Sequence, residues 1–152
     1  MSKLLSVLVI GAILGAITIK ISEYLNFEIP APVAKLVDGA VYQGDMIDGV
    51  IAGQGRMRWG NGDRYEGNFE NGLFHGQGNF DRVDGSSYEG EYSQGAMTGT
   101  GTMIYSEDQQ YTGEFLFGRM HGKGVFKSHG TLYEGEFLNS EFDGEGKYTD
   151  EY

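Results

Sequence analysis

The chain has 152 residues, of which 26 are glycine, and its formal net charge is −11. Two prolines and no three-residue glycine period exclude collagen, whereas an aromatic content of 13% is too high for a disordered linker. The acidic charge opposes nucleic acid as a partner, and the lack of cysteine excludes disulfides, thiolate metal sites and cysteine nucleophiles.

An uncharged apolar run, Leu4 to Ile19, lies near the start of the chain. As a helix this run is about 24 Å long, and its continuation through Leu25 reaches about 33 Å, enough to cross a hydrocarbon core of about 30 Å. We therefore expect residues 1–25 to form a single-pass transmembrane anchor that contacts the membrane through residues 4–25. A cleaved secretory signal and a buried helix of a soluble fold are the alternatives.

Three further expectations concern the same region. Gly11 and Gly15 have the spacing of small-residue helix contacts, so this helix face is one route to a homo-oligomer. The short head before the apolar run favours an orientation with the rest of the chain on the non-cytoplasmic side. Residues 26–41, which contain Pro30 and Pro32, are expected to form a stalk.

From residue 42 the chain repeats a phrase in which Tyr-x-Gly is followed by Gly-x-Gly, eleven residues after the tyrosine. Successive tyrosines are 23, 23, 23 and 22 residues apart. This spacing gives five copies with the bounds 42–64, 65–87, 88–110, 111–132 and 133–152. The glycines of the phrase are expected to be structural, namely Gly44, Gly53, Gly55, Gly67, Gly76, Gly78, Gly90, Gly99, Gly101, Gly113, Gly122, Gly124, Gly135, Gly144 and Gly146.

Each copy has the internal pattern of a hairpin. A bulky apolar residue, aromatic in four copies, follows the tyrosine by four positions, and a glycine (Ser140 in the last copy) follows it by seven. Positions 0, 2 and 4 share one face of a strand, as do positions 11, 13 and 15. The pattern therefore predicts a two-stranded antiparallel hairpin that turns near position seven. In-strand glycines are expected to leave hollows for aromatic rings of the same or a neighbouring copy, and the copies must stack because a lone hairpin is marginal.

The phrase resembles the MORN repeat (membrane occupation and recognition nexus) over residues 42–146, with a partial continuation to the terminus. The resemblance implies an all-β fold, a curved and twisted single-layer antiparallel sheet of stacked hairpins, here preceded by one N-terminal hydrophobic helix. Ten strands would give a rod roughly 48 Å long. Asp108 and Ser140 stand where other copies have glycine, which affects the local turns and not the architecture.

The resemblance also suggests a function, because carriers of this repeat act mainly as scaffolds for partners and membranes. We expect a non-enzymatic, membrane-anchored scaffold that binds protein partners through an aromatic groove. A phospholipid-binding or membrane-tethering module is the alternative. The side chains expected to line the groove are Tyr42, Trp59, Tyr65, Phe69, Tyr88, Tyr92, Tyr111, Phe115, Tyr133 and Phe137.

The remaining polar residues predict no catalytic, metal or cofactor site. His75 and His121 hold the same repeat position two copies apart, and a separation of about 19 Å prevents them from sharing a metal ion. The glutamates lie on an open strand face without the pocket that acid catalysis needs, so they are expected to be solvated. Weak binding of Ca²⁺ or of a basic partner is the alternative. The last strand, around Gly144–Tyr148, is an open edge, and we expect it to pair with a second copy or a protein partner.

Overall fold

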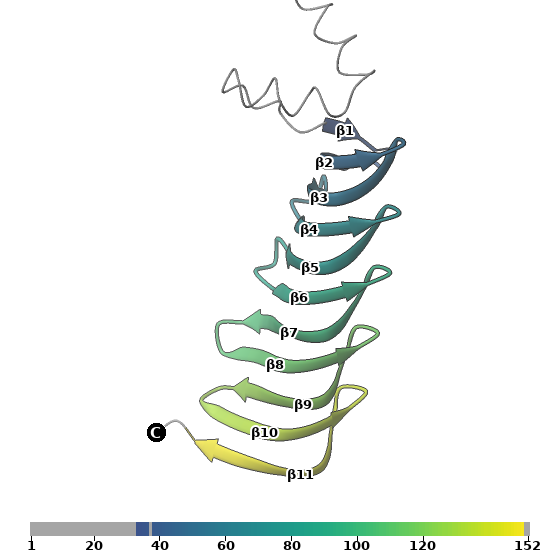
Figure 1. Ribbon diagram of the computed structural model, residues 1–152. Coiled ribbons are helices and arrows are strands. Elements are labelled where there is room, and N and C mark those ends of the chain that lie inside the picture. The colour runs from purple at the N-terminus through teal and green to yellow at the C-terminus, as the bar shows by residue number, and fades with distance from the viewer. Residues whose placement is uncertain (1–32, 37, 151–152) are drawn as a thin grey trace, which may run out of the picture. The chain divides into compact units, whose positions relative to one another are not determined.

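The computed structural model describes residues 33–36 and 38–150, all of which belong to one unit of the chain, Pro32–Tyr152. The described residues form a single sheet of eleven strands, and each strand pairs with its neighbours in sequence (Figure 1). The strands are β1 (Val33–Lys35), β2 (Val41–Ile47), β3 (Val50–Arg58), β4 (Arg64–Glu70), β5 (Leu73–Asp81), β6 (Ser87–Ser93), β7 (Ala96–Ser106), β8 (Gln109–Leu116), β9 (Arg119–Ser128), β10 (Thr131–Leu138) and β11 (Glu141–Asp150).

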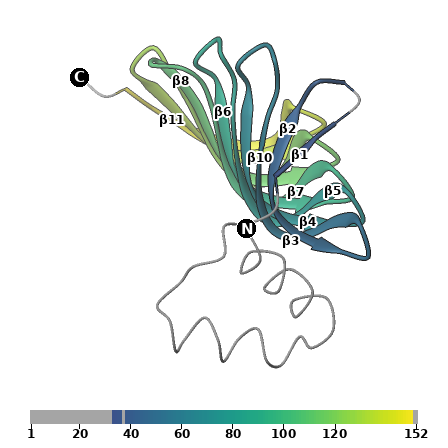
Figure 2. The ribbon, with the colours of Figure 1, turned by 90° about the horizontal axis from the view of Figure 1, so that it is seen from above.

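Every pairing in this sheet is antiparallel, and no helix occurs within residues 33–36 and 38–150. The predicted all-β single-layer sheet of stacked hairpins is therefore confirmed. Seen from above, successive hairpins fan out about the stack, as the twist of a β-sheet requires (Figure 2). Ten of the strands come from the five copies of the repeat, two from each.

The tight turn of each copy lies at the predicted position. The loops between β2 and β3, β4 and β5, β6 and β7, and β8 and β9 are two residues long, and both residues have positive φ. Such a pair matches the twist of the flanking strands, and the second position is glycine in these four copies. Ser140 takes that position in the last copy with a φ of 72°, so the turn is kept without glycine.

The Gly-x-Gly segment interrupts the pairing in each copy. On one side of β3, the pairing with β2 shifts register between Gly44 and Met46 of β2. On the other side, the pairing of Gly53–Arg58 of β3 with β4 is continuous. The first glycine of the segment has positive φ, 72° at Gly53. This is a β-bulge, which bends the second strand of the copy and increases its local twist.

The short strand β1 was not predicted, because its residues belong to the expected stalk. Val33–Lys35 pair with Val41–Gln43 of β2 and thereby extend the sheet by one strand beyond the repeats. The turn that follows has Gly39 at a φ of 85°, and the amide of Leu36 donates to the carbonyl of Ala40. At least part of residues 26–41 is therefore sheet.

The expected membrane anchor, its hydrophobic helix and the Gly11 and Gly15 pair lie outside the described residues, so these expectations stay predictions. Within the part of the chain that the structure describes, no helix is long and apolar enough to cross a membrane.

Candidate functional site

One face of the sheet, called here the aromatic face, carries a row of five tyrosines from the first strands of the copies. Four of them, Tyr42, Tyr65, Tyr88 and Tyr111, are almost completely buried, and Tyr133 is 5% exposed. Their rings lie over paired glycines on adjacent strands, such as Gly67 and Gly78, where an added Cβ would collide with the ring or hydroxyl of Tyr65. The predicted hollows and their occupation by aromatic rings are therefore confirmed.

Four of the five tyrosine hydroxyls donate to backbone carbonyls within the sheet. Tyr65 donates to the carbonyl of Asn68 at 2.9 Å, and Tyr88 donates to the carbonyl of Glu91 at 3.1 Å. Tyr42 and Tyr111 make the same contact to the residue three positions on, at 2.7 and 2.9 Å. Burial raises the pKa of Tyr65, Tyr88 and Tyr111 to about 12, so these groups are neutral donors at any physiological pH.

A second row of rings, four positions after the tyrosines, connects the copies. Phe69 meets Tyr42 of the preceding copy and Tyr65 of its own edge to face, with centroids 5.2 and 5.0 Å apart. Tyr92, Phe115 and Phe137 bridge successive tyrosines in the same way. Each ring thus packs between two copies, which couples the stability of one copy to that of the next.

These two rows supply nine of the ten side chains that were predicted to line a groove, and all nine are buried. Trp59 alone of the predicted set is half-buried. Buried rings offer little surface to a partner, so any contact on this face is made mainly by other side chains.

The accessible layer of the aromatic face comes from the second strands of the copies. Phe74 of β5 stacks on Tyr65 with ring centroids 3.8 Å apart and planes 8° from parallel, and it remains half-buried. The residues nine and fifteen positions after each tyrosine share this location. Those that stay half-buried or exposed are Phe74, Phe80, Met97, Met120, Phe126, Phe142 and Tyr148. The repeat pattern predicted that these side chains lie on the aromatic face. They are more exposed than the tyrosines because the tyrosines lie beneath them.

The densest part of this layer, called here the Trp59 cluster, consists of Trp59, Phe74, Phe80 and Arg82. The Trp59 ring is 6.0 Å from Phe74 and 5.5 Å from Phe80, between ring centroids. The guanidinium carbon of Arg82 lies 5.2 Å from the centroid of Phe80, a cation–π geometry. Half-exposed aromatics with an adjacent arginine have the composition of protein–protein contact sites.

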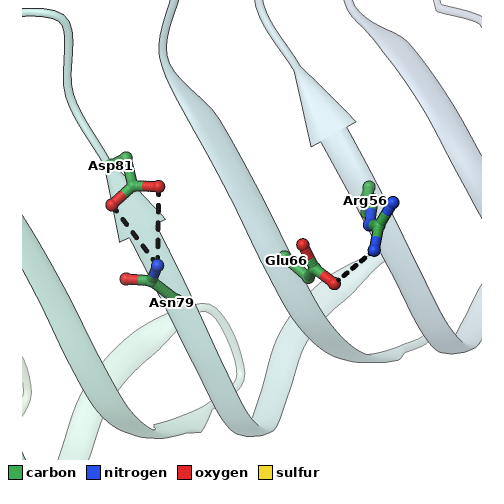
Figure 3. Close-up of polar contacts among 4 residues, drawn as sticks. All are labelled: Arg56, Glu66, Asn79 and Asp81. Atoms are coloured by element: carbon green, nitrogen blue, oxygen red, sulfur yellow. Dashed lines mark hydrogen bonds and ion pairs between the residues drawn. The ribbon is translucent and has the colours of Figure 1, made fainter.

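The opposite face, called here the polar face, carries exposed charged and amide side chains. Arg56 of β3 pairs with Glu66 of β4 at 2.9 Å, and the Asn79 amide donates to Asp81 on the same strand (Figure 3). No charged or polar side chain is buried among the described residues. This face therefore has the open, solvated character that was predicted for it.

Three acidic side chains on the polar face have a structural role that the sequence analysis did not assign. Asp45 accepts the backbone N–H of Gln54 at 3.0 Å, and Glu114 accepts that of Lys123 at 2.9 Å. Glu91 accepts both the backbone N–H and the hydroxyl of Thr100, and these bonds hold its pKa below the usual range. Each carboxylate caps the residue between the two glycines of a bulge.

His75 and His121 lie on different strands, β5 and β9. The structure places His75 beside Glu70, with Nδ1 and a carboxylate oxygen 3.3 Å apart. Across residues 33–36 and 38–150, no group of three or more histidine, aspartate or glutamate side chains is arranged to hold a metal ion.

A family model described as MORN repeat matches residues 42–64, 65–87, 88–108, 111–129 and 133–151. These segments coincide with the five sheet-forming copies. The comparison with curated proteins found no match.

Proposed function

The matched segments cover more than half of the chain, so the chain belongs to the MORN repeat family, and we propose that it acts as a membrane-anchored scaffold without enzymatic activity. MORN repeats are found in membrane-associated and in lipid- or protein-binding proteins. In this proposal residues 4–25 fix the chain to a bilayer as a single-pass anchor, and the sheet binds a protein partner on the non-cytoplasmic side.

The observation that carries the proposal is the half-exposed second layer of the aromatic face, above all the Trp59 cluster. Four copies can present such side chains in one row because the sheet is a single layer and nothing described covers that face. An exposed apolar row of this kind is typical of an interaction site. The net charge of −11 favours a partner whose apolar contacts are flanked by lysine or arginine, such as a basic amphipathic segment.

Site-specific photo-crosslinking tests this proposal. A photoreactive amino acid at Phe80 is compared with the same group at Asn79, which is its neighbour on β5 but points to the polar face and is exposed. We expect a protein to be captured from Phe80 and not from Asn79, in membranes that contain the full-length chain. Equal capture from the two positions, or capture from Asn79 alone, would contradict binding through the aromatic face.

Two further measurements test the membrane part. Extraction of membranes at alkaline pH should leave the full chain in the pellet and release a chain that starts at Pro32. Protease protection of intact membranes then reports the side on which the repeats lie. Flotation of that shortened chain with anionic but not with neutral vesicles would instead support a phospholipid-binding module, which the net charge opposes.

A further inference from the structure

Arg82 places a positive charge on the aromatic face. Its guanidinium carbon lies 5.2 Å from the centroid of the Phe80 ring, and Phe80 in turn contacts Trp59. The strand positions that form this face, at 0, 2, 4, 9, 11, 13 and 15 residues from each tyrosine, hold no charged residue in any copy. Arg82 stands at position seventeen. The residues at this position in the other copies are Trp59, Tyr105, Ser128 and Asp150, so the second copy alone has a cation there.

The loop that carries Arg82 is fixed by its own hydrogen bonds. The backbone N–H of Arg82 donates to the carbonyl of Ser86 at 2.9 Å, and the N–H of Val83 donates to Asp63 of the preceding loop at 2.9 Å. The side chain is held as well, because Nη1 of Arg82 donates to Oγ of Ser86 at 3.2 Å and the guanidinium lies over Phe80. A ligand that binds this guanidinium therefore has little ordering of the side chain to offset.

The charge of Arg82 is not neutralised by an ion pair with a described residue. The acid of the same loop, Asp84, accepts the hydroxyl and the backbone N–H of Ser86 at 2.7 and 2.9 Å. These bonds hold the pKa of the Asp84 carboxyl below its usual range. Arg82 itself is exposed, and an arginine side chain carries a planar fork of N–H donors, only part of which one hydroxyl can engage.

This charge decides which side chains fit beside the Trp59 cluster. A lysine or arginine of a partner would meet a like charge, and Arg82 already lies over the Phe80 ring that could attract it. A carboxylate instead matches the fork of the guanidinium. The half-buried rings of Trp59 and Phe74, 6.0 Å apart between centroids, offer an apolar surface next to it. The cluster therefore combines an apolar floor with one cationic wall.

The distances fix how close the two partner groups must be. Trp59 lies 5.5 Å from Phe80 between ring centroids, and the guanidinium of Arg82 lies 5.2 Å beyond Phe80. In an extended segment, residues two positions apart lie on the same side at a separation of about 6.6 Å. An apolar side chain and a carboxylate at that spacing can reach the rings and Arg82 together.

We propose that Arg82 selects a protein segment in which an aspartate or glutamate lies two residues from an apolar side chain. The apolar side chain packs on Trp59 and Phe74, and the carboxylate pairs with Arg82. This inference rests on the proposed function, in which the Trp59 cluster binds a protein partner, and it names the chemistry of that partner. The flanks of the segment remain basic, as the net charge of the chain favours, so the single acidic residue sets the direction in which the segment lies on the sheet.

Fluorescence titration with defined peptides tests the proposal, because Trp59 is the only tryptophan in the chain. The probes are the capped peptide acetyl-Lys-Phe-Ser-Glu-Leu-Lys-amide and the same peptide with glutamine in place of glutamate. The full-length chain is held in nanodiscs of neutral lipid, which leave no free detergent to cover the aromatic face. About 0.15 M salt screens the net charge of the chain. The measured quantity is the ratio of the two affinities.

We expect the glutamate peptide to bind about three- to tenfold more tightly than the glutamine peptide, as the usual net value of one hydrogen-bonded contact predicts. Arg82→Gln should bring this ratio close to one, and Arg82→Lys should retain part of it. Arg64→Gln is the matched control, since it removes an exposed arginine on the polar face and should leave the ratio unchanged. A comparison of ratios cancels the effect of net charge, which both arginine variants alter equally.

The outcomes separate this inference from the proposed function. If both peptides change the fluorescence of Trp59 with equal affinity, the cluster binds apolar segments and the preference for a carboxylate is overturned. An equal fall of the ratio in Arg82→Gln and Arg64→Gln would likewise show that net charge and not the position of Arg82 is responsible. If neither peptide changes the fluorescence, the Trp59 cluster is not a binding site and both proposals fail.

Discussion

The ring of Tyr88 occupies the space directly above Gly101 on the neighbouring strand. A Cβ at position 101 would collide with the hydroxyl and the ring of Tyr88, and Gly101 is itself paired with Gly90 across β6 and β7. The same arrangement of one tyrosine over two paired glycines occurs in all five copies. It explains how a sheet that is a single layer over residues 33–36 and 38–150 can bury large side chains, because the glycines leave room for the rings.

Gly101→Ala should destabilise the fold by about 3 kcal/mol, since overpacking a filled site costs about 1–3 kcal/mol and this methyl group meets a ring that cannot move away. The measurement is urea unfolding of the full chain in detergent, followed by circular dichroism. Gly60→Ala is the matched control because no atom lies within 4 Å of its added Cβ and its φ is not in the left-handed region. Equal losses for the two variants would show that the space above Gly101 is not filled.

Tyr88→Phe should reduce the free energy of unfolding by about 1 kcal/mol, the usual net value of one hydrogen bond. The ring stays in place over the glycines, while the bond from the hydroxyl to the Glu91 carbonyl is lost. Tyr105→Phe is the control because that ring is 42% exposed. A Tyr88→Phe variant as stable as the parent would mean that the hydroxyl adds nothing to the packing of the ring.

The repeat spacing was sufficient to predict the ten strands of the repeats, the tight turn within each copy and the face on which each side chain of these strands lies. Period and spacing specify a face, but they do not specify depth on that face. Tyr65 and Phe74 have the same orientation, yet Tyr65 lies flat on the glycines and Phe74 covers it. The residues predicted to line the groove are therefore mostly those of the buried layer. The accessible layer, which includes Phe74, depends on this packing and has no separate signal in the sequence.

Two other features had no sequence signal strong enough to predict. The strand β1 has only three residues and no repeat phrase, so nothing distinguished Val33–Lys35 from the expected stalk. The capping carboxylates, such as Glu91, look like other glutamates of the polar face. Their role depends on the bulge, which exposes one backbone N–H that the regular ladder would have paired.

Stability should fall as the pH rises from about 10 to about 12. Burial raises the pKa of Tyr65, Tyr88 and Tyr111 to about 12, whereas an unfolded chain titrates near 10. The unfolded state therefore loses protons first, and the stabilisation present below pH 10 is lost through this interval, by about 1.4 kcal/mol for each pKa unit and group. Thermal unfolding across this pH range measures the loss of stability, and tyrosinate absorbance reports the ionisation of the tyrosines. Ionisation of all tyrosines near pH 10 without unfolding would contradict their burial.

Glu91→Ala should lower the stability by about 1 kcal/mol or less, because it leaves the Thr100 backbone N–H at the bulge without its carboxylate partner. Glu89→Ala, an exposed change two residues away on the same strand, should have a smaller effect.

The pH dependence separates capping of the bulge by Glu91 from general charge effects. The bonds from Thr100 hold the pKa of Glu91 below its unfolded value of about 4.3, so their stabilisation is complete above that pH and is lost as the pH falls through the folded pKa. The stability difference between the parent and Glu91→Ala should therefore shrink in acid, and a difference that stays constant down to pH 2 would show that the carboxylate does not cap the bulge.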